Sequence, residues 1–356
     1  MNNKLANGSI LDPFFTPIGL KDFAVSWVGP HPLQPGFCFG SEDGRLLLTN
    51  LHAKVTSGPF KASASGEAIN GVAFSGEWLA VSTRADVTMR CFPRVAGVKA
   101  VVLPYGAHGV VAVQSGYFAA PMGHTGVMML KAGSGPGDDV GVLSPVNNGM
   151  DFYQVIAMRG RGKKDLLVCA TRQQGIGLTE LRWGNPTYNM RIAAFEGIDV
   201  VDVCAVPSKS GSPAIAAVGL DGSLILVRDA LRDPAPTNIK FKTIKGTAYR
   251  VLCRGEDLVV LTSRGLYVLE KLAHRLASGT QAENFTTQIF AVPMEAVDAN
   301  IVRDRWLLVI TSDEVFVGDL DLIRHARPKD SEISQTVNQA RQTHDLPLSA
   351  NILTAV

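Results

Sequence analysis

The chain has 356 residues, of which 34 are basic and 32 acidic, so its formal net charge is only +2. This balance gives no overall attraction for nucleic acid or for an anionic membrane, and the hydrophobic share of 46% is too high for a disordered chain. The apolar runs, such as residues 306–310, fall far short of the roughly 20 residues that a membrane-spanning helix needs, and residues 1–8 do not resemble a secretory signal. We therefore expect a folded cytoplasmic protein.

One pattern recurs seven times along the chain, namely a nearly all-apolar run, a tight turn and a second apolar run. Turns such as Asp221-Gly222 between runs of this kind are typical of β-hairpins. The turn corners lie 40 to 49 residues apart, with a mean spacing of 45, at Gly44, Asp86, Gly126, Gly175, Gly222, Gly265 and Glu314. A period of about 40 to 50 residues is typical of the four-stranded blade of a β-propeller.

Two further strands complete each unit. An apolar stretch precedes every hairpin and is expected to form the inner strand, at residues 23–28, 69–74, 109–113, 153–157, 200–205, 249–252 and 297–302. Outer strands, in which polar and apolar residues alternate as on an exposed edge, are predicted at 99–103, 140–143, 239–244 and 286–292. The pattern therefore predicts an all-β fold, a seven-bladed β-propeller. A six-bladed ring is the alternative if residues 284–317 are divided differently.

The last unit has no outer strand of its own, because residues 319–327 do not show the strand pattern. Residues 9–18, in contrast, are strand-like and have no place in the first unit. If they form the outer strand of the last blade, the ring closes by joining the two ends of the chain and leaves no open sheet edge. We thus expect an N-terminal extension at 1–8, a propeller at 9–326 and a tail at 327–356.

Two segments are predicted to be helical. Leucines 269, 272 and 276 share one helical face, which indicates a short helix between the third and fourth strands of the sixth blade. In the tail, Asp330 or Ser331 can cap a helix over about 331–342, which cannot continue far toward Pro347. We expect this helical and extended tail to pack along the ring or to dock on a partner through its apolar residues Ile333, Val337, Leu346, Leu348, Ile352 and Leu353.

At this point the chain resembles the WD40-like propeller superfamily. The stretch 219–229 is similar to the end of a WD40 repeat, with Arg228-Asp229 where Trp-Asp is usual, and residues 40–50 have a similar pattern. The repeats are degenerate, since the chain has no Trp-Asp pair and no Gly-His pair that opens a repeat. The resemblance covers nearly the whole chain and implies the propeller fold, but it carries over no particular binding site.

Linear motifs of catalysis and metal binding are missing from the sequence. The seven histidines show no HxxxH, HxH or His-Cys spacing, and His124 is interpreted as a solvated turn residue. The five cysteines are never closer than 35 positions and are interpreted as inert core thiols. No P-loop, Gly-x-Ser-x-Gly or dinucleotide-binding glycine pattern occurs. We therefore expect no catalytic residue, no cofactor and no metal site.

One charged cluster stands out, a glycine-rich turn between the first two strands of the fourth blade. It contains Arg159, Arg161, Lys163 and Lys164. Backbone amides and basic side chains of such a turn can hold a phosphate or a nucleic-acid backbone, although an exposed polar hairpin turn is the better explanation of the cluster. Further basic stripes and stacking aromatics, which nucleic-acid binders usually add, are missing.

A complete ring without a chemical motif predicts a non-enzymatic interaction platform, a scaffold or adaptor that holds partner proteins in a larger assembly. One alternative is a propeller enzyme of the hydrolase or lactonase type that acts on a small substrate in the central channel. Carboxylates that converge at the channel mouth would favour this alternative. The other is phosphate or nucleic-acid binding through residues 159–164.

Overall fold

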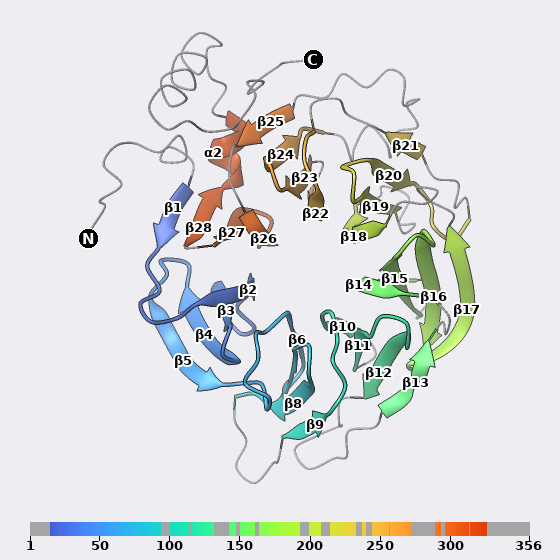
Figure 1. Ribbon diagram of the computed structural model, residues 1–356, viewed down its shortest axis with the longest axis horizontal. Coiled ribbons are helices and arrows are strands. Elements are labelled where there is room, and N and C mark those ends of the chain that lie inside the picture. The colour runs from blue at the N-terminus through green and yellow to red at the C-terminus, as the bar shows by residue number, and fades with distance from the viewer. Residues whose placement is uncertain are drawn as a thin grey trace.

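The computed structural model describes residues 15–93, 100–113, 116–131, 142–146, 150–160, 164–192, 199–207, 214–232, 237–239, 244–255, 257–271, 289–292, 296–312 and 314–325. These residues form seven four-stranded antiparallel sheets arranged as blades around a central axis (Figure 1). The seven-bladed all-β prediction is confirmed. None of the described helices is long and apolar enough to span a bilayer.

Each blade runs from an inner strand at the axis to an outer strand at the circumference. In chain order of the blades, the inner strands are β2 (Val25–Pro30), β6 (Gly71–Ser75), β10 (Val111–Val113), β14 (Phe152–Arg159), β18 (Val200–Val206), β22 (Ala248–Arg254) and β26 (Ala296–Val302). The second strands are β3 (Gly36–Ser41), β7 (Trp78–Ser82), β11 (Tyr117–Pro121), β15 (Asp165–Thr171), β19 (Ala214–Gly219), β23 (Asp257–Thr262) and β27 (Trp306–Thr311).

The third strands follow the predicted hairpin turns. They are β4 (Arg45–Asn50), β8 (Val87–Cys91), β12 (Val127–Lys131), β16 (Ile176–Arg182), β20 (Leu224–Val227), β24 (Gly265–Leu269) and β28 (Val315–Asp319). The outer strands are β5 (Val55–Lys61), β9 (Val101–Leu103), β13 (Val142–Val146), β17 (Asn185–Ile192), β21 (Thr237–Ile239), β25 (Ile289–Val292) and, for the seventh blade, β1 (Phe15–Ile18). Glycine stands at corners such as Gly44 and Gly222 because the turn there requires φ values of +76° and +81°.

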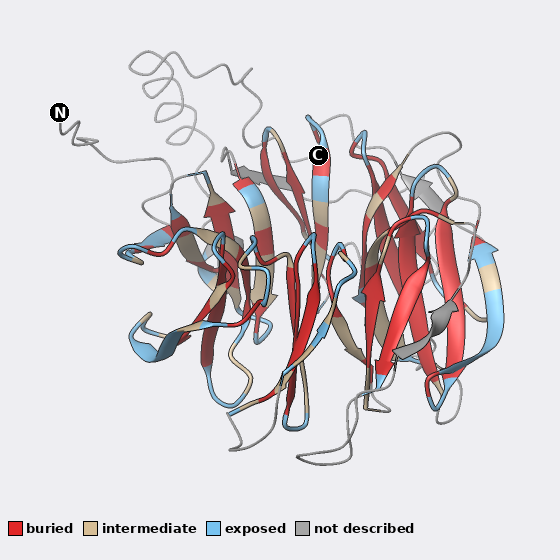
Figure 2. Cartoon of the chain, turned by 60° about the horizontal axis from the view of Figure 1, so that its bottom comes forward, coloured by how far each residue is buried: buried red, intermediate tan, exposed pale blue. Residues whose placement is uncertain are grey.

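The second and third strands are apolar because both of their faces are covered by neighbouring blades. All seven residues of β15 are buried, whereas β17 at the circumference is mostly exposed (Figure 2). The hydrophobic core is divided into seven clusters, each built from residues of two adjacent blades. The core is therefore itself a ring, and each blade is stabilised by both of its neighbours.

The two ends of the described chain meet in the seventh blade. Strand β1 pairs antiparallel with β28, with Phe15 opposite Gly318 and Ile18 opposite Val315 (Figure 1). Phe15 packs into the cluster between blades six and seven, and Ile18 packs into the cluster between blades seven and one. A single short strand thus contacts both core clusters that border the seventh blade.

Several details differ from the prediction. The outer strand of the fifth blade ends at Ile239, and Ile244 is a buried core residue outside that strand. A short helix, α2 (Leu320–His325), follows β28 where the sequence indicated only the absence of a strand. The predicted helix after Leu269, from residue 272 on, and the whole predicted tail lie outside the described residues.

Candidate functional site

Five of the inner strands begin with the same irregularity. A β-bulge interrupts the pairing of the inner strand with the second strand in blades one, four, five, six and seven. The residues directly after the bulge are Trp27, Gln154, Asp202, Arg250 and Asp298. Bulges re-aim side chains, and they occur here at one end of the ring, which we call the bulge face. The turns between second and third strands lie on this same face because the strands are antiparallel.

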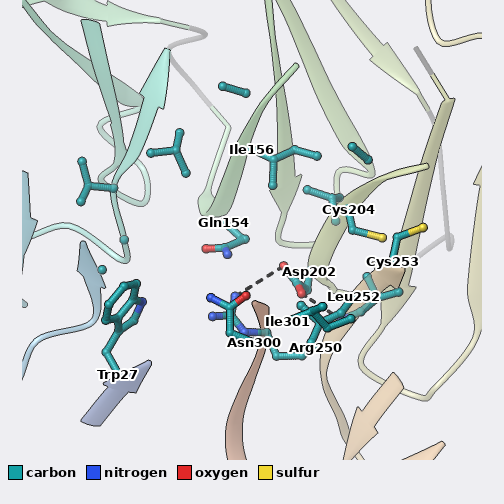
Figure 3. Close-up of a pocket in the computed structure, with 18 of the residues that line it drawn as sticks. Trp27, Gln154, Ile156, Asp202, Cys204, Arg250, Leu252, Cys253, Asn300 and Ile301 are labelled. Atoms are coloured by element: carbon teal, nitrogen blue, oxygen red, sulfur yellow. Dashed lines mark hydrogen bonds and ion pairs between the residues drawn. The ribbon is translucent and has the colours of Figure 1, made fainter. Parts of the chain in front are cut away.

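A cavity of about 390 Å³ occupies the central channel and is lined by inner-strand residues of all seven blades (Figure 3). Polar side chains from blades four to seven form one part of its wall, among them Gln154, Asp202, Arg250 and Asn300. Trp27 and Val110, from blades one and three, form an apolar part on the other side. Apolar side chains also lie among the polar ones, so the wall is mixed, and its charged side chains come from blades five and six.

The polar side is organised around Arg250. Its Nε lies 2.6 Å from Asp298 Oδ1, and its Nη2 donates to Asp298 Oδ2 at 3.3 Å. Its Nη1 lies 3.8 Å from Asp202 Oδ1, while Asp202 Oδ2 accepts a hydrogen bond from the Val251 amide at 2.8 Å. One guanidinium therefore joins the inner strands of three consecutive blades.

The two carboxylates do not share Arg250 equally. Asp298 takes the two hydrogen bonds, and Asp202 is 2% exposed with an Oδ1 that has no hydrogen-bond partner among the described residues. Burial raises the pKa of Asp202 to about 6, although Arg250 and the Val251 amide act in the opposite direction. Burial alone would lower the pKa of Arg250, but the two carboxylates outweigh it, so the guanidinium stays charged.

Two thiols also line the channel. Burial raises the pKa of the Cys253 thiol to about 12 and raises that of the Cys204 thiol as well. Both therefore remain protonated near neutral pH, which is the state of an unreactive thiol. In the described part of the chain, no group of three or more His, Cys, Asp or Glu side chains is arranged to hold a metal ion.

The bulge face carries a row of exposed apolar side chains on blades five, six and seven. Leu220, Tyr249 and Val297 are 43%, 40% and 63% exposed, and we call these three residues the rim patch. Leu220 adjoins Tyr249 because its carbonyl accepts a hydrogen bond from the amide of Ala248 at 3.1 Å. Tyr249 and Val297 are the extra residues of their bulges, so the same irregularity that turns Arg250 and Asp298 inward turns these residues outward.

A polar cluster adjoins the rim patch on blades three to five. The guanidinium of Arg172 lies 5.1 Å from the centre of the Tyr153 ring, and its Nε lies 3.5 Å from Asp199 Oδ2. The carbonyl of Asp199 accepts a hydrogen bond from the Leu220 amide at 2.9 Å, which connects this cluster to the rim patch. His124 is exposed as predicted for a turn residue, but its Nε2 also lies 3.3 Å from Asp151 Oδ2.

The residues predicted from the sequence as contact sites lie elsewhere. Arg159 is exposed at the end of β14, on the face opposite the bulge face. Lys164 Nζ lies 3.1 Å from Glu180 Oε2, so this cation is already engaged by a buried carboxylate. Arg161, Lys163 and the tail residues Ile333, Val337, Leu346, Leu348, Ile352 and Leu353 lie outside the described residues. Phosphate binding by the basic turn stays a prediction.

Sequence reasoning missed the channel residues, although a signal was present. Gln154, Asp202, Arg250 and Asp298 follow one another at intervals of 48 residues, close to the repeat length. Each is a polar residue inside a short β-rich stretch that was expected to form an inner strand. Polar residues at equivalent repeat positions of neighbouring blades must converge at the axis, so this regular interval is the signal that points to the channel.

Comparisons with known proteins agree with this architecture. No family model matches the chain, and no curated protein sequence matches it. Among solved structures, the chain is similar to the Cps50 (Swd1) β-propeller domain of Myceliophteria thermophila, with a TM-score of 0.62 and 13% sequence identity over 86% of this chain and 99% of that domain. Because 1305 chains of solved structure match, the fold alone does not identify a function. The chain has the fold of a WD40-like seven-bladed β-propeller.

Proposed function

We propose that this protein is a non-enzymatic interaction platform in the cytoplasm, and that a partner protein docks on the bulge face over the rim patch. The observation that carries the proposal is the row Leu220, Tyr249 and Val297, which leaves three large apolar side chains exposed on consecutive blades. Large apolar side chains that are exposed on one face of a protein next to polar residues are typical of protein interaction sites.

The surroundings of the rim patch also suit a protein partner. Tyr153 and Arg172 stack beside it, and aromatic and arginine side chains are the residue types that contribute most to binding at protein interfaces. The strands below are paired into rigid sheets, so docking requires little ordering of the backbone. A rigid surface of this kind needs no cofactor to recognise a partner.

The enzyme alternative has one observation in its favour, because the carboxylates of Asp202 and Asp298 do converge in the channel. Both, however, face the guanidinium of Arg250, which holds them as ion-pair partners rather than as a free acid and base. Two carboxylates that act as general acid and base in hydrolysis need separate environments and access to substrate. The platform is therefore the proposal that the geometry supports better.

Affinity purification of the tagged protein, followed by mass spectrometry, tests the platform. We expect a stoichiometric partner with the wild type and at least about tenfold less of it with the double variant Tyr249→Asp/Val297→Asp. The matched control is Leu33→Asp/Trp183→Asp, which places two acidic residues at positions 64% and 65% exposed on the opposite face. Equal capture by both double variants, or the absence of any stoichiometric partner, would contradict the proposal.

A further inference from the structure

The hydrogen-bonding groups of the central channel are unevenly used. Two amide donors are occupied, since Asn300 Nδ2 donates to the Val28 carbonyl at 3.0 Å and Asn70 Nδ2 donates to the Ala107 carbonyl at 2.6 Å. Arg250 directs its Nε and Nη2 to Asp298. These donors of the channel are therefore committed to the protein itself.

The acceptors, in contrast, are available. Among the described residues, Asp202 Oδ1 accepts no hydrogen bond, although Arg250 Nη1 lies 3.8 Å from it. The hydrogen bond of Asn300 uses its amide nitrogen and not its side-chain oxygen. Figure 3 shows the Asp202 carboxylate at the cavity, on the side where Gln154, Arg250 and Asn300 also lie. A carboxylate oxygen that is buried without a donor is costly, and a ligand that donates a hydrogen bond would remove this cost.

The charge of the site favours a cation. Asp202 and Asp298 bring two carboxylates to one guanidinium, and Asp298 takes the hydrogen bonds of that guanidinium. Burial raises the pKa of Asp202, and the guanidinium that faces its carboxylate, 3.8 Å away, is shared with Asp298. An anionic ligand would meet both carboxylates, whereas a cationic donor would supply the missing charge.

The other residues of the cavity wall indicate what kind of group the cation carries. Ile156, Leu252 and Ile301 line the cavity beside the polar groups, and Trp27 faces them from the first blade (Figure 3). The cavity is open to solvent, and its volume of about 390 Å³ lies in the range of small-molecule sites. These surfaces suit an aliphatic chain rather than a second polar group.

We propose that the central channel binds an alkylammonium group, with the ammonium donating to Asp202 Oδ1 and to the side-chain oxygen of Asn300 while its aliphatic chain packs on the apolar wall. A free small amine and the lysine side chain of a partner both carry this group. The site is separate from the rim patch, so the inference does not depend on the proposed function.

Saturation-transfer NMR with n-butylammonium as the probe tests the site. At pH 7.5 we expect transfer to the methylene protons in the wild type, none to n-butanol, and a signal weakened by about tenfold or more in Asp202→Asn. Asp43→Asn is the control, because it neutralises an exposed carboxylate of the bulge face outside the channel. Equal signals from the wild type and Asp202→Asn, or from butanol and butylammonium, would overturn the proposal.

A second measurement keeps the test valid if Asp202→Asn fails to fold. Butylammonium binding to the wild type should weaken by about fivefold or more between pH 7.5 and pH 5, because protonation of Asp202 removes its charge. The other ionisable groups near Asp202 are Cys204 on its own strand, Arg250 and Cys253 on β22, and Asp298 on β26. Binding that does not change over this pH range would count against Asp202 as the anchor.

The two sources of the ammonium group are separated with a capped Gly-Gly-Lys-Gly-Gly peptide. Competition of this peptide with butylammonium supports the site and assigns it to a lysine side chain. Failure of the peptide to compete, with butylammonium still bound, supports the site and assigns it to a free amine.

Discussion

Arg250 lies between two carboxylates that come from the blades on either side of it. Because it is the shared cation of Asp202 and Asp298, its removal leaves two buried or half-buried negative charges without compensation. The ion pair therefore matters less for the stability it adds than for the charge it neutralises. The same two ion pairs fix the positions of the inner strands of blades five, six and seven relative to one another.

We expect Arg250→Met to lower the free energy of unfolding by about 3 to 5 kcal/mol, because it keeps the volume of the side chain and removes the charge. The triple variant Arg250→Met/Asp202→Asn/Asp298→Asn should recover most of this loss, since no charge is then left uncompensated. Urea unfolding measures both effects. A loss below about 1 kcal/mol in the single variant would show that the carboxylates are not dependent on Arg250.

Asp202 also makes stability depend on pH in a direction unusual for a carboxylate. Its pKa is about 6 in the folded protein and near 3.8 in the unfolded chain, so between these values the folded state binds more protons. Its contribution to stability therefore falls as the pH rises from about 4 to 6, by up to about 3 kcal/mol. The difference between wild type and Asp202→Asn in urea unfolding isolates this contribution, and a difference that is constant from pH 4 to 7 would contradict it.

At the residue scale, the sequence predicted the strands that carry the channel residues but not their role. The stretch around Asp202 is otherwise apolar, and such a pattern indicates a buried strand whatever single polar residue it contains. That Asp202 and Arg250 meet follows only from the closure of the ring, which brings positions 48 residues apart to adjacent inner strands. The β-bulges that direct these side chains inward could not be predicted from the amino-acid composition of the strands.

Neighbouring blades are joined by the turn that ends at Asp86. Its carboxylate accepts hydrogen bonds from Thr83 Oγ1 at 2.5 Å, from Thr88 Oγ1 at 2.8 Å and from Ser65 Oγ at 2.8 Å. Burial alone would raise the pKa of Asp86, but these hydrogen bonds outweigh it and hold the pKa below its usual value. Ser65 lies in the loop that enters blade two, so this residue connects the turn to that loop.

Asp86→Ala should lower the free energy of unfolding by about 3 kcal/mol, because it leaves several buried donors without an acceptor. Asp43→Ala is the matched control in the equivalent turn of blade one. Its carboxylate is largely exposed and, among the described residues, is bonded to Ser41 and Arg45 of its own turn, so we expect a loss below about 1 kcal/mol. Thermal and urea unfolding compare the two variants, and equal losses would argue against the role of Asp86.

The seventh blade depends on strand β1. Deletion of residues 1–18 removes the partner of β28 together with Phe15 and Ile18, whereas deletion of residues 1–14 leaves β1 in place. The first deletion should lower the melting temperature by several degrees, since a lost buried aromatic side chain alone costs about 3 to 5 kcal/mol. The second should change it little. Closely similar melting temperatures for the two truncated proteins would contradict closure by β1.

At the element scale, the burial of a strand determined whether it could be predicted from the sequence. The second and third strands are buried on both faces, so they appear as apolar runs and were predicted in all seven blades. The outer strands β5 and β17 are mostly exposed and carry almost no hydrophobic pattern, so they were not identified. They are strands because they pair with β4 and β16, and their own residues give no sign of this in the sequence.

On the scale of the whole molecule, the core belongs to pairs of blades and not to single blades. Each of the seven clusters is shared by two neighbours, and the cluster between blades seven and one closes the ring. A blade removed from this ring would expose both of its apolar faces to water. The ring is therefore expected to unfold as one cooperative unit, and its two faces keep a fixed geometry for binding.

The last prediction concerns the segment after α2. All seven sheets are built from residues 15–319, and β1 supplies the final strand, so the ring does not need residues 327–356 for closure. Because this segment still offers apolar residues such as Ile333 and Leu348, we expect it to contribute to partner binding. Truncation after residue 326 should leave the urea midpoint of unfolding within experimental error while lowering capture of the stoichiometric partner. A truncated protein that unfolds at the same urea concentration and captures the partner as well as the full chain does would show that the segment has no part in assembly.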